Sequence, residues 1–536
     1  MQPLEPLFRL YMKISIMKRI IYSIIIGLSM MSCSSIKKDN AHLNDLISED
    51  DLKSDTDFIY KKLQDLHPKL YWYITKEKLD FKFDSLKTTI NKPMTSFDFY
   101  KKIAPVICEV RQGHMFVTPS IKKYSKKETA SIIKRGDGPL SQFDFEVFNN
   151  KLYVIKNKSN NKSIQVGSEV VTIDGEKVSL LLADYKTRFT SDGFNQTLKN
   201  NFLGQRFSTM YSLNNDIKDS IKYDFNINNE LKSIVIKRKI IDSTDIKSKK
   251  ITLTKEQKKE IAKKKDIFGY DAKSKKYMRN LKFIEKDSSI AIMKIQGFKD
   301  GDSKEFYKQS FQKIRKYNTQ TLIIDIRNNG GGSLNEISNL YTYLTDKDFK
   351  FIEKSQVTKK TSLLYADYYK GGGIGGKILK TIFAPFYYPI MYFSVHKNGN
   401  NYYSYTNSKV KKVNADSFNG KVYVLINGGS FSASSIISSN LKGSKRALFI
   451  GEETGGAYNG TVAGRMPMVE MPHSKINVRM GLMACIPTYK TEVEGYGIMP
   501  DKEIIPTLED RIKDNDPELN WVLQDLKPNN TDVSKN

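Results

Sequence analysis

A serine stands where the chain passes from a strand-like to a helix-like segment. Ser432 follows an apolar, β-branched run at residues 422–426 and a short stretch of small residues, and an apolar-periodic segment follows it. This order predicts a strand, a tight turn and a helix that begins near Ser432. Backbone N–H groups and the positive end of the helix dipole would then lie close to an oxyanion formed at Ser432. The same order also fits a serine that only caps the helix, as Ser430 or Ser434 could. This segment alone leaves both interpretations open.

A second segment can supply backbone donors. Residues 321–333 (TLIIDIRNNGGGS) have the pattern of a buried strand that ends in Arg-Asn-Asn and three glycines. Glycines at the end of a strand let the backbone approach a ligand closely and point free N–H groups at it. A phosphate-binding loop is the rival interpretation, but the GxxxxGK[ST] pattern is absent and no lysine follows the glycines. The phosphate-binding alternative is therefore disfavoured.

The two segments together resemble serine peptidase family 41, which includes the C-terminal-processing (tail-specific) proteases and the tricorn core protease. Residues 325–332 fit the family's DxRxNxGG motif, and residues 432–434 fit its Ser-Ala-Ser nucleophile motif. Residues 451–456 fit the Gly-Glu-x-Thr-x-Gly loop that follows the nucleophile. The resemblance implies an α/β, ClpP/crotonase-like catalytic core with an N-terminal helical domain and a PDZ-like β-rich domain. It also implies a serine-type endopeptidase that acts on polypeptides without a metal or organic cofactor.

The family has two catalytic arrangements, and Ala457 indicates which of them this chain resembles. The tail-specific branch uses a Ser–Lys dyad, and Ala457 occupies the position of that lysine. Lys442 and Lys445 lie too early in the motif to replace it. The tricorn-like branch instead takes a histidine and a glutamate from distant segments. The chain should therefore use this second arrangement or be inactive.

Two segments resemble the histidine and glutamate motifs of the tricorn-like branch. Residues 107–117 (ICEVRQGHMFV) place His114 in a DGHT-like motif, and residues 493–501 (VEGYGIMPD) place Glu494 in an ENxGVxPD-like motif. The resemblance implies that Ser432 is the nucleophile, His114 the general base and Glu494 the supporting acid. In such a triad a neutral imidazole accepts the serine proton, and the acid fixes its tautomer and stabilises the imidazolium.

The resemblance also implies an oxyanion hole, and it shows two departures from the family pattern. Gly330 or Gly331, together with Ala433, would donate backbone N–H groups to the oxyanion. Gly113 stands where the tricorn-like enzymes have a relay serine, and Gln112 stands where they have an acidic residue. The acid could then contact the imidazole directly, through water, or not at all. These departures favour the alternative of a catalytically weak or inactive homologue that binds peptides.

The beginning of the chain resembles a bacterial lipoprotein signal peptide. Met17-Lys-Arg is followed by an apolar run and then by Cys33, which comes after small or apolar residues. The apolar run is too short for a comfortable membrane span, which needs about 20 residues. Met17 is then the expected start, and a lipidated Cys33 would anchor a periplasmic or cell-surface protein to the membrane, with the outer membrane favoured. A plain cleaved signal peptide is the alternative.

The composition supports an exported protein that folds into several domains. The chain has 536 residues, which is enough for two to four domains. The formal charge is +28, but lysine is spread along the whole chain, and neither a zinc knuckle nor an aromatic RNA-binding motif is present. We therefore expect no nucleic-acid partner and only weak attraction to anionic surfaces. Cys108 and Cys485 indicate no disulfide framework and are expected to be small buried residues.

The remaining patterns predict the order of the domains. They are a signal peptide (1–33), an N-terminal helical domain carrying His114 (45–120), a PDZ-like domain (138–240), a Lys-rich linker (241–285), the catalytic domain (286–510) with an insert (354–413), and a C-terminal tail (511–536). In the insert, a GGGIGG stretch precedes an aromatic-apolar run that Pro385 and Pro389 should keep from forming a regular spanning helix. A lid over the active site, a membrane-dipping element and a buried strand pair all remain open for this run.

Overall fold

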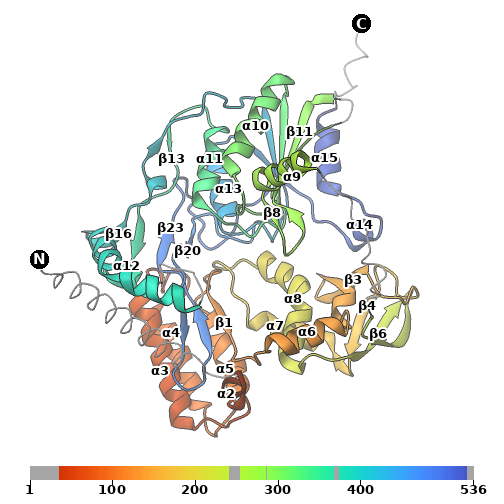
Figure 1. Cartoon of the computed structure of the whole chain (residues 1–536), viewed down its shortest axis with the longest axis vertical. Coiled ribbons are helices and arrows are strands. Elements are labelled where there is room, and N and C mark those ends of the chain that lie inside the picture. The colour runs from red at the N-terminus through yellow and green to blue at the C-terminus, as the bar shows by residue number, and fades with distance from the viewer. Residues whose placement is uncertain (1–35, 241–253, 285–286, 367–372, 528–536) are drawn as a thin grey trace, which may run out of the picture.

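We obtained a computed structural model of the chain, which describes residues 36–240, 254–284, 287–366 and 373–527. Figure 1 shows an α/β core in the upper part of the molecule, the N-terminal helices at the lower left and a β-rich domain at the lower right. The expected signal peptide and the lipidation site Cys33 lie outside the described residues.

A six-stranded sheet, which we call the core sheet, forms the α/β core with strand order β10-β11-β12-β18-β19-β24. Its strands from β11 onward are parallel, and β10 pairs antiparallel with β11. The strands are β10 (Arg279–Ile284), β11 (Asp287–Ile295), β12 (Thr321–Asp325), β18 (Lys421–Ile426), β19 (Leu448–Gly451) and β24 (Lys502–Glu503). Because β12 and β18 are parallel neighbours, the glycine loop and the Ser432 turn both leave from the same edge of this sheet.

Helices cover both faces of the core sheet, which explains why its central strands are apolar throughout. Leu322 and Ile324 of β12 pack in one hydrophobic cluster with helices α10, α11 and α13, whereas Ile323 packs with Val522 of helix α15 in another. Strands buried on both faces form continuous apolar runs rather than alternating ones. The helices are α10 (Ser303–Lys316), α11 (Leu334–Thr342), α13 (Ala433–Gly443) and α15 (Pro517–Asp525).

The β-rich domain is an antiparallel sheet with strand order β2-β3-β4-β6-β7, to which the short strand β5 adds beside β4. Its elements are β2 (Phe143–Phe148), β3 (Lys151–Asn157), β4 (Glu169–Ile173), β5 (Glu176–Lys177), α7 (Val178–Thr187), α8 (Thr197–Asn215), β6 (Ser220–Ile227) and β7 (Glu230–Lys237). Helix α8 lies so close to the edge strand β2 that a Cβ on Gly204 would stand 2.9 Å from the Cα of Glu146. An extended peptide therefore has no room to add to β2 at this point. The PDZ-like character of this domain remains a prediction.

Three N-terminal helices hold the segment that carries His114. They are α3 (Glu49–Leu66), α4 (Lys76–Thr88) and α5 (Ser96–Cys108), and each begins at a Ser or Thr whose side chain caps it. The chain then passes His114 and enters β1 (Phe116–Thr118), which pairs antiparallel with β22 (Asn477–Arg479). Because β22 comes from the C-terminal half of the chain, this pairing fixes the His114 loop relative to the α/β core.

Two of the expected domain boundaries differ from the structure. The expected linker at residues 241–285 includes helix α9 (Lys255–Phe268) and strand β10, so the α/β core begins before residue 286. The expected tail at residues 511–536 includes α15, whose Val522 is buried against the core sheet. The composition did not reveal β10 and α15 because the apolar side chains of both become buried only when they pack against the core.

The insert contains both a small sheet and a helix. Strands β14 (Ser355–Val357), β15 (Val395–Asn398) and β16 (Asn400–Tyr403) form a sheet of order β14-β16-β15. The aromatic-apolar run lies in helix α12 (Gly373–Phe393), with Pro385 and Pro389 inside it. The strand-pair alternative for this run is therefore wrong.

A buried histidine at the end of α3 should make stability sensitive to acid. Burial lowers the pKa of His67 to about 3, and neither ring nitrogen has a hydrogen-bond partner among the described residues. Its folded pKa lies below the unfolded value, so its contribution to stability is present above pH ~6.5 and is lost as pH falls. From about pH 7 to about pH 5, this residue should lower the free energy of unfolding by about 2 kcal/mol. Urea unfolding of the wild type and of His67→Leu at both pH values checks this. An equal loss of stability in the two proteins would contradict it.

Candidate active site

Ser432 lies in a strained turn between β18 and α13. Its backbone has φ +61° and ψ −116°, a conformation that costs a non-glycine residue about 1–3 kcal/mol. Nucleophiles of other hydrolases stand on such sharp strand-to-helix turns, which expose the hydroxyl. Although Ser432 occupies the N-cap position of α13, its side chain makes no capping hydrogen bond. The capping interpretation therefore does not describe the Ser432 hydroxyl.

The hydroxyl of Ser432 is paired with His114. Its Oγ lies 2.9 Å from His114 Nε2, although 318 positions separate the two residues in the chain. The carbonyl oxygen of His114 accepts a hydrogen bond of 3.2 Å from Arg479 Nε, and its ring lies 4.7 Å from that of Phe431. The structure thus brings together two of the three residues predicted for the triad.

The imidazole of His114 is held in its neutral form. Burial, together with the positive charge of Arg479, lowers its pKa to about 3. For Nε2 to accept the proton of Ser432, the ring proton must be on Nδ1. Nδ1 is buried and has no hydrogen-bond partner in the part of the chain that the structure describes. The base is therefore in the correct charge state, but no direct contact fixes its tautomer.

A carboxylate that sequence reasoning missed lies beside the His114 loop. Asp192, in the loop between α7 and α8, is fully buried and accepts a 2.8 Å hydrogen bond from the N–H of Gly113. The Thr461 hydroxyl donates to it at 3.0 Å and the Ala457 N–H at 3.4 Å. Burial raises the pKa of Asp192 to about 6, and the three donors partly offset that effect. Asp192 thus ties the His114 loop to the segment where the dyad lysine would otherwise stand.

The absence of a relay serine at Gly113 has a steric reason. A Cβ at this position would lie 2.7 Å from Cε2 of Phe431 and 3.1 Å from Oδ1 of Asp192. The ring of Phe431, the residue before the nucleophile, therefore fills the space that a side chain at position 113 would need. The side chain of Gln112 is buried, and neither of its polar atoms has a partner among the described residues.

Glu494 is not brought to the imidazole. It is exposed, and among the described residues no hydrogen bond joins it to His114. It lines a cavity of about 670 Å³ together with Tyr73, Arg111 and Phe194. The backbone beside Glu494 nevertheless lies next to the Asp192 loop, because the N–H of Phe194 donates to the Gly495 carbonyl at 2.7 Å. The structure thus places a buried carboxylate, rather than Glu494, next to the His114 loop.

One of the three predicted oxyanion donors already donates a hydrogen bond within the protein, and the other two do not among the described residues. The N–H of Gly331 donates to Oδ1 of Asn329 at 3.0 Å, so it is not free for a substrate. The N–H groups of Gly330 and Ala433 have no acceptor among the described residues, and Ala433 is the first residue of α13. A Cβ on Gly331 would lie 2.7 Å from Cβ of Ser432, and one on Gly330 would meet nothing within 4 Å. Gly330 and Ala433 are therefore the better pair of candidates.

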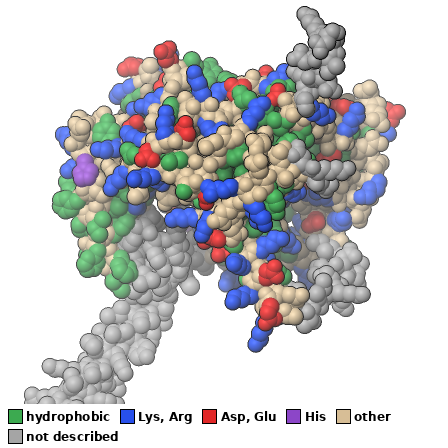
Figure 2. All heavy atoms as spheres, turned by 90° about the horizontal axis from the view of Figure 1, so that it is seen from above, with side chains coloured by type: hydrophobic (Ala, Val, Ile, Leu, Met, Phe, Trp, Pro, Cys, Tyr) green, Lys and Arg blue, Asp and Glu red, His purple; other side chains and the backbone are tan. Residues whose placement is uncertain are grey.

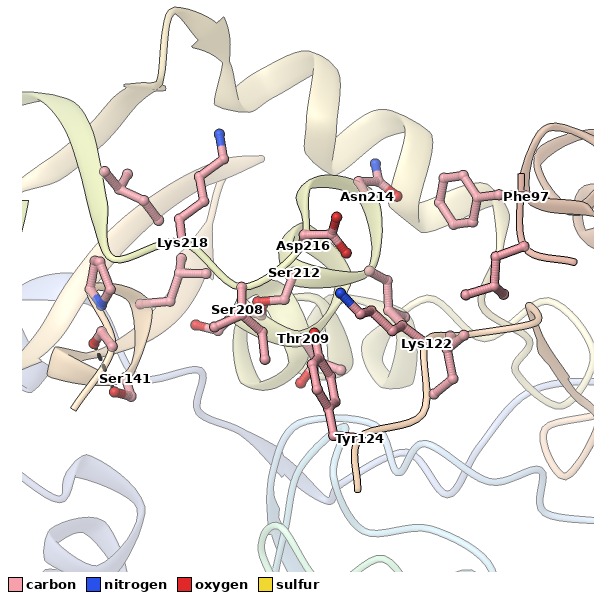
Figure 3. Close-up of a pocket in the computed structure, with 18 of the residues that line it drawn as sticks. Phe97, Lys122, Tyr124, Ser141, Ser208, Thr209, Ser212, Asn214, Asp216 and Lys218 are labelled. Carbon is pink, nitrogen blue, oxygen red and sulfur yellow. Dashed lines mark hydrogen bonds between the residues drawn. The ribbon is translucent and has the colours of Figure 1, made fainter. Parts of the chain in front are cut away.

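A cavity of about 950 Å³ elsewhere in the molecule lacks a paired serine and histidine like those of the Ser432 turn. It lies where the N-terminal region meets the β-rich domain, and Figure 3 shows Lys122, Ser212 and Asp216 around it. Neither Ser432 nor His114 lines it. The candidate active site is therefore the Ser432 turn.

Comparison with known proteins agrees with the geometry of this turn. Residues 289–504 match the family model of peptidase family S41. The chain carries an S41 peptidase domain. This S41 domain contains the Ser432 turn and the glycine loop, while His114 and Asp192 come from the segments before it. No curated protein shows significant sequence similarity to the chain.

Two solved structures share the fold of most of the chain around the S41 domain. Mature CPAF is 15% identical with a TM-score of 0.53, over 87% of this chain and 94% of that one. Mature CPAF complexed with lactacystin is 14% identical with a TM-score of 0.54, over 89% and 97%. At these identities the likeness shows the fold alone. The prediction of an α/β core with additional domains is confirmed.

Proposed function

We propose that this protein is a serine endopeptidase that forms an acyl-enzyme on Ser432 with His114 as the general base. The observation that carries the proposal is the 2.9 Å separation of Ser432 Oγ and His114 Nε2 within a strained turn of the S41 domain. Burial lowers the pKa of His114 to about 3, so the imidazole is neutral in the resting enzyme and Nε2 carries a free lone pair.

The reaction then follows from these groups. The Ser432 hydroxyl attacks the peptide carbonyl while its proton moves to Nε2 of His114, and the oxyanion accepts N–H donors from Ala433 and Gly330. The imidazolium next gives its proton to the leaving amine, and the acyl-enzyme remains on Ser432. A water molecule, deprotonated by the same imidazole, releases the acid product and restores the serine.

Asp192 takes the place of the supporting acid in this proposal. It touches neither the substrate nor the imidazole; it holds the Gly113 amide and so positions the residue that follows. A buried carboxylate next to the His114 loop would also stabilise the positive charge that forms on His114 during turnover. Burial strengthens this effect, because few water molecules screen the charge.

Glu494 should then be dispensable for the chemical step. Because Glu494 is exposed and is not bonded to His114, we expect Glu494→Gln to keep kcat within about three-fold of the wild type. Steady-state hydrolysis of a peptide substrate measures this. A loss of about 100-fold in kcat would instead give Glu494 the role of the supporting acid.

The proposed substrates are exported or envelope polypeptides, and the proposed location is the cell envelope with a lipid on Cys33. This part of the proposal rests on the N-terminal sequence, in which a short basic segment is followed by an apolar run and then by Cys33. Labelling with a fatty-acid analogue should mark the wild type and not Cys33→Ser. Equal labelling of both, or a mature N-terminus elsewhere by mass spectrometry, would contradict it.

Hydrolysis of an unfolded polypeptide tests the proposed activity. The purified chain should release peptides, and Ser432→Ala should release none above the buffer control. Ser434→Ala is a matched control, because the Ser434 hydroxyl donates to the Asn329 carbonyl, whereas the hydroxyl that contacts His114 is that of Ser432. A folded wild type that binds the polypeptide but never cleaves it would favour the alternative of an inactive peptide-binding homologue.

A further inference from the structure

Helix α12 exposes large apolar side chains along its described length. The exposed fraction is 73% for Phe393, 68% for Phe386, 66% for Ile390 and 56% for Ile382. Figure 2 shows hydrophobic side chains gathered at the left edge of the molecule, the side on which Figure 1 places α12. Monomeric soluble proteins rarely expose a contiguous apolar patch of this kind, and such patches mark interaction sites.

The opposite side of α12 fixes the helix to the body of the protein. Met391 is 5% exposed and belongs to the hydrophobic cluster of the N-terminal helices, and Tyr387 packs against the same cluster. The guanidinium of Arg465 contacts both the ring and the hydroxyl of Tyr387. Residues four apart lie on one side of a helix. This narrow side therefore packs, and the wider apolar face, defined by Ile382, Phe386, Ile390 and Phe393, remains in solvent.

The exposed face of α12 is apolar, whereas its rim is basic. Residues 381–393 include no charged side chain. At the rim, Lys360 Nζ lies 5.4 Å from the ring of Tyr392, and Lys397 is exposed on β15 directly after the helix. An apolar, aromatic centre with a basic rim is typical of helices that lie in the interface of membranes with anionic headgroups. The net charge of +28 also favours binding to anionic headgroups.

A second copy of the chain fits this surface less well than a lipid surface does. A two-fold dimer brings the same patch of both copies together. The basic rim of one copy, which includes Lys360 and Lys397, would then lie near the basic rim of the other, and like charges repel. Anionic headgroups have the opposite charge and leave the apolar centre in contact with acyl chains.

We propose that α12 docks on an anionic lipid bilayer, with the face defined by Ile382, Phe386, Ile390 and Phe393 in the interface and the rim lysines at the headgroups. In the part of the chain that the structure describes, no helix has the length and apolar character needed to cross a membrane. Such docking would hold the protein at the membrane surface, independently of any lipid on Cys33 and of peptidase activity.

Vesicle sedimentation tests the proposal on the chain from Ser34, which keeps every described residue and lacks the expected lipid site. Phe386→Ser/Ile390→Ser/Phe393→Ser should lower partitioning into phosphatidylcholine–phosphatidylglycerol vesicles by at least about ten-fold. Leu231→Ser/Val235→Ser is the matched control, because these side chains are 67% and 55% exposed on β7, and it should bind like the wild type. Lys360→Glu/Lys397→Glu should weaken binding to these vesicles several-fold and leave binding to pure phosphatidylcholine unchanged.

Several outcomes would overturn the proposal. They are a wild-type chain that does not bind the vesicles, a triple variant that binds as well as the wild type, and unaltered vesicle binding by Lys360→Glu/Lys397→Glu. Sedimentation velocity tests whether a second copy of the chain covers this face instead. A dimeric wild type together with a monomeric triple variant would assign the face to a second copy. The triple variant should keep its melting temperature and its hydrolysis of a soluble peptide, because its three positions are exposed and away from Ser432.

Discussion

Replacement of His114 by alanine should lower kcat for peptide hydrolysis by about 10⁴-fold or more. The expected loss is large because Ser432 is a poor nucleophile without a base, and removal of a base from a serine triad disables the whole unit. His114 Nε2 is the group that lies within 2.9 Å of the hydroxyl. Steady-state kinetics on one peptide substrate, with melting temperatures to verify folding, measures the effect.

A lysine variant provides the control for this result. Lys442 forms an ion pair with Asp501, and Ala457 has no amine to offer. Lys442→Ala should therefore stay within about three-fold of the wild type. Full activity in His114→Ala, or a collapse of activity in a well-folded Lys442→Ala, would overturn the assignment of the base.

Asp192→Asn should have the next largest effect, with kcat reduced by about 100-fold and KM little changed. The variant removes the buried charge that faces the His114 loop, while an amide oxygen can still accept the Gly113 and Thr461 hydrogen bonds. A purely structural role would change stability and KM, whereas a role in the reaction changes kcat. Asp144→Asn is a control, because Asp144 is an exposed partner of Lys158.

The pH profile separates Asp192 from His114. Burial raises the pKa of Asp192 to about 6 and lowers that of His114 to about 3. Asp192 is needed as a carboxylate, so kcat/KM should fall as pH falls through about 6, while His114 remains neutral over the same range. This acid limb should be missing in Asp192→Asn and should persist in Asp144→Asn. An unchanged limb in Asp192→Asn would remove Asp192 from the mechanism.

The nucleophile and the base could be predicted from the sequence because each lies inside a short motif that resembles one of serine peptidase family 41. Ser432 follows a buried strand and precedes a helix, and His114 lies in a short motif at the end of another helix. Both patterns reflect backbone geometry that neighbouring residues specify. The glycine loop was also predicted, although only the structure shows that Asn329 occupies the Gly331 amide.

Asp192 and α12 could not be predicted in this way. Asp192 obtains its role from donors at Gly113, Ala457 and Thr461, which the chain brings together only on folding. Its one local signal was the Asp-Gly pair in residues 191–197, which also fits an ordinary turn. In α12, the two prolines argue only against a regular membrane-spanning helix, and the sequence does not show that one side of this run packs while the other stays exposed.

Labelling with a fluorophosphonate probe shows whether Ser432 is an activated nucleophile, because the probe reacts with a serine hydroxyl only where a base activates it. We expect one labelled peptide carrying Ser432 in the wild type and in Ser434→Ala, and none in Ser432→Ala or His114→Ala. Equal labelling of Ser432→Ala, or a folded wild type that takes up no probe, would contradict this expectation.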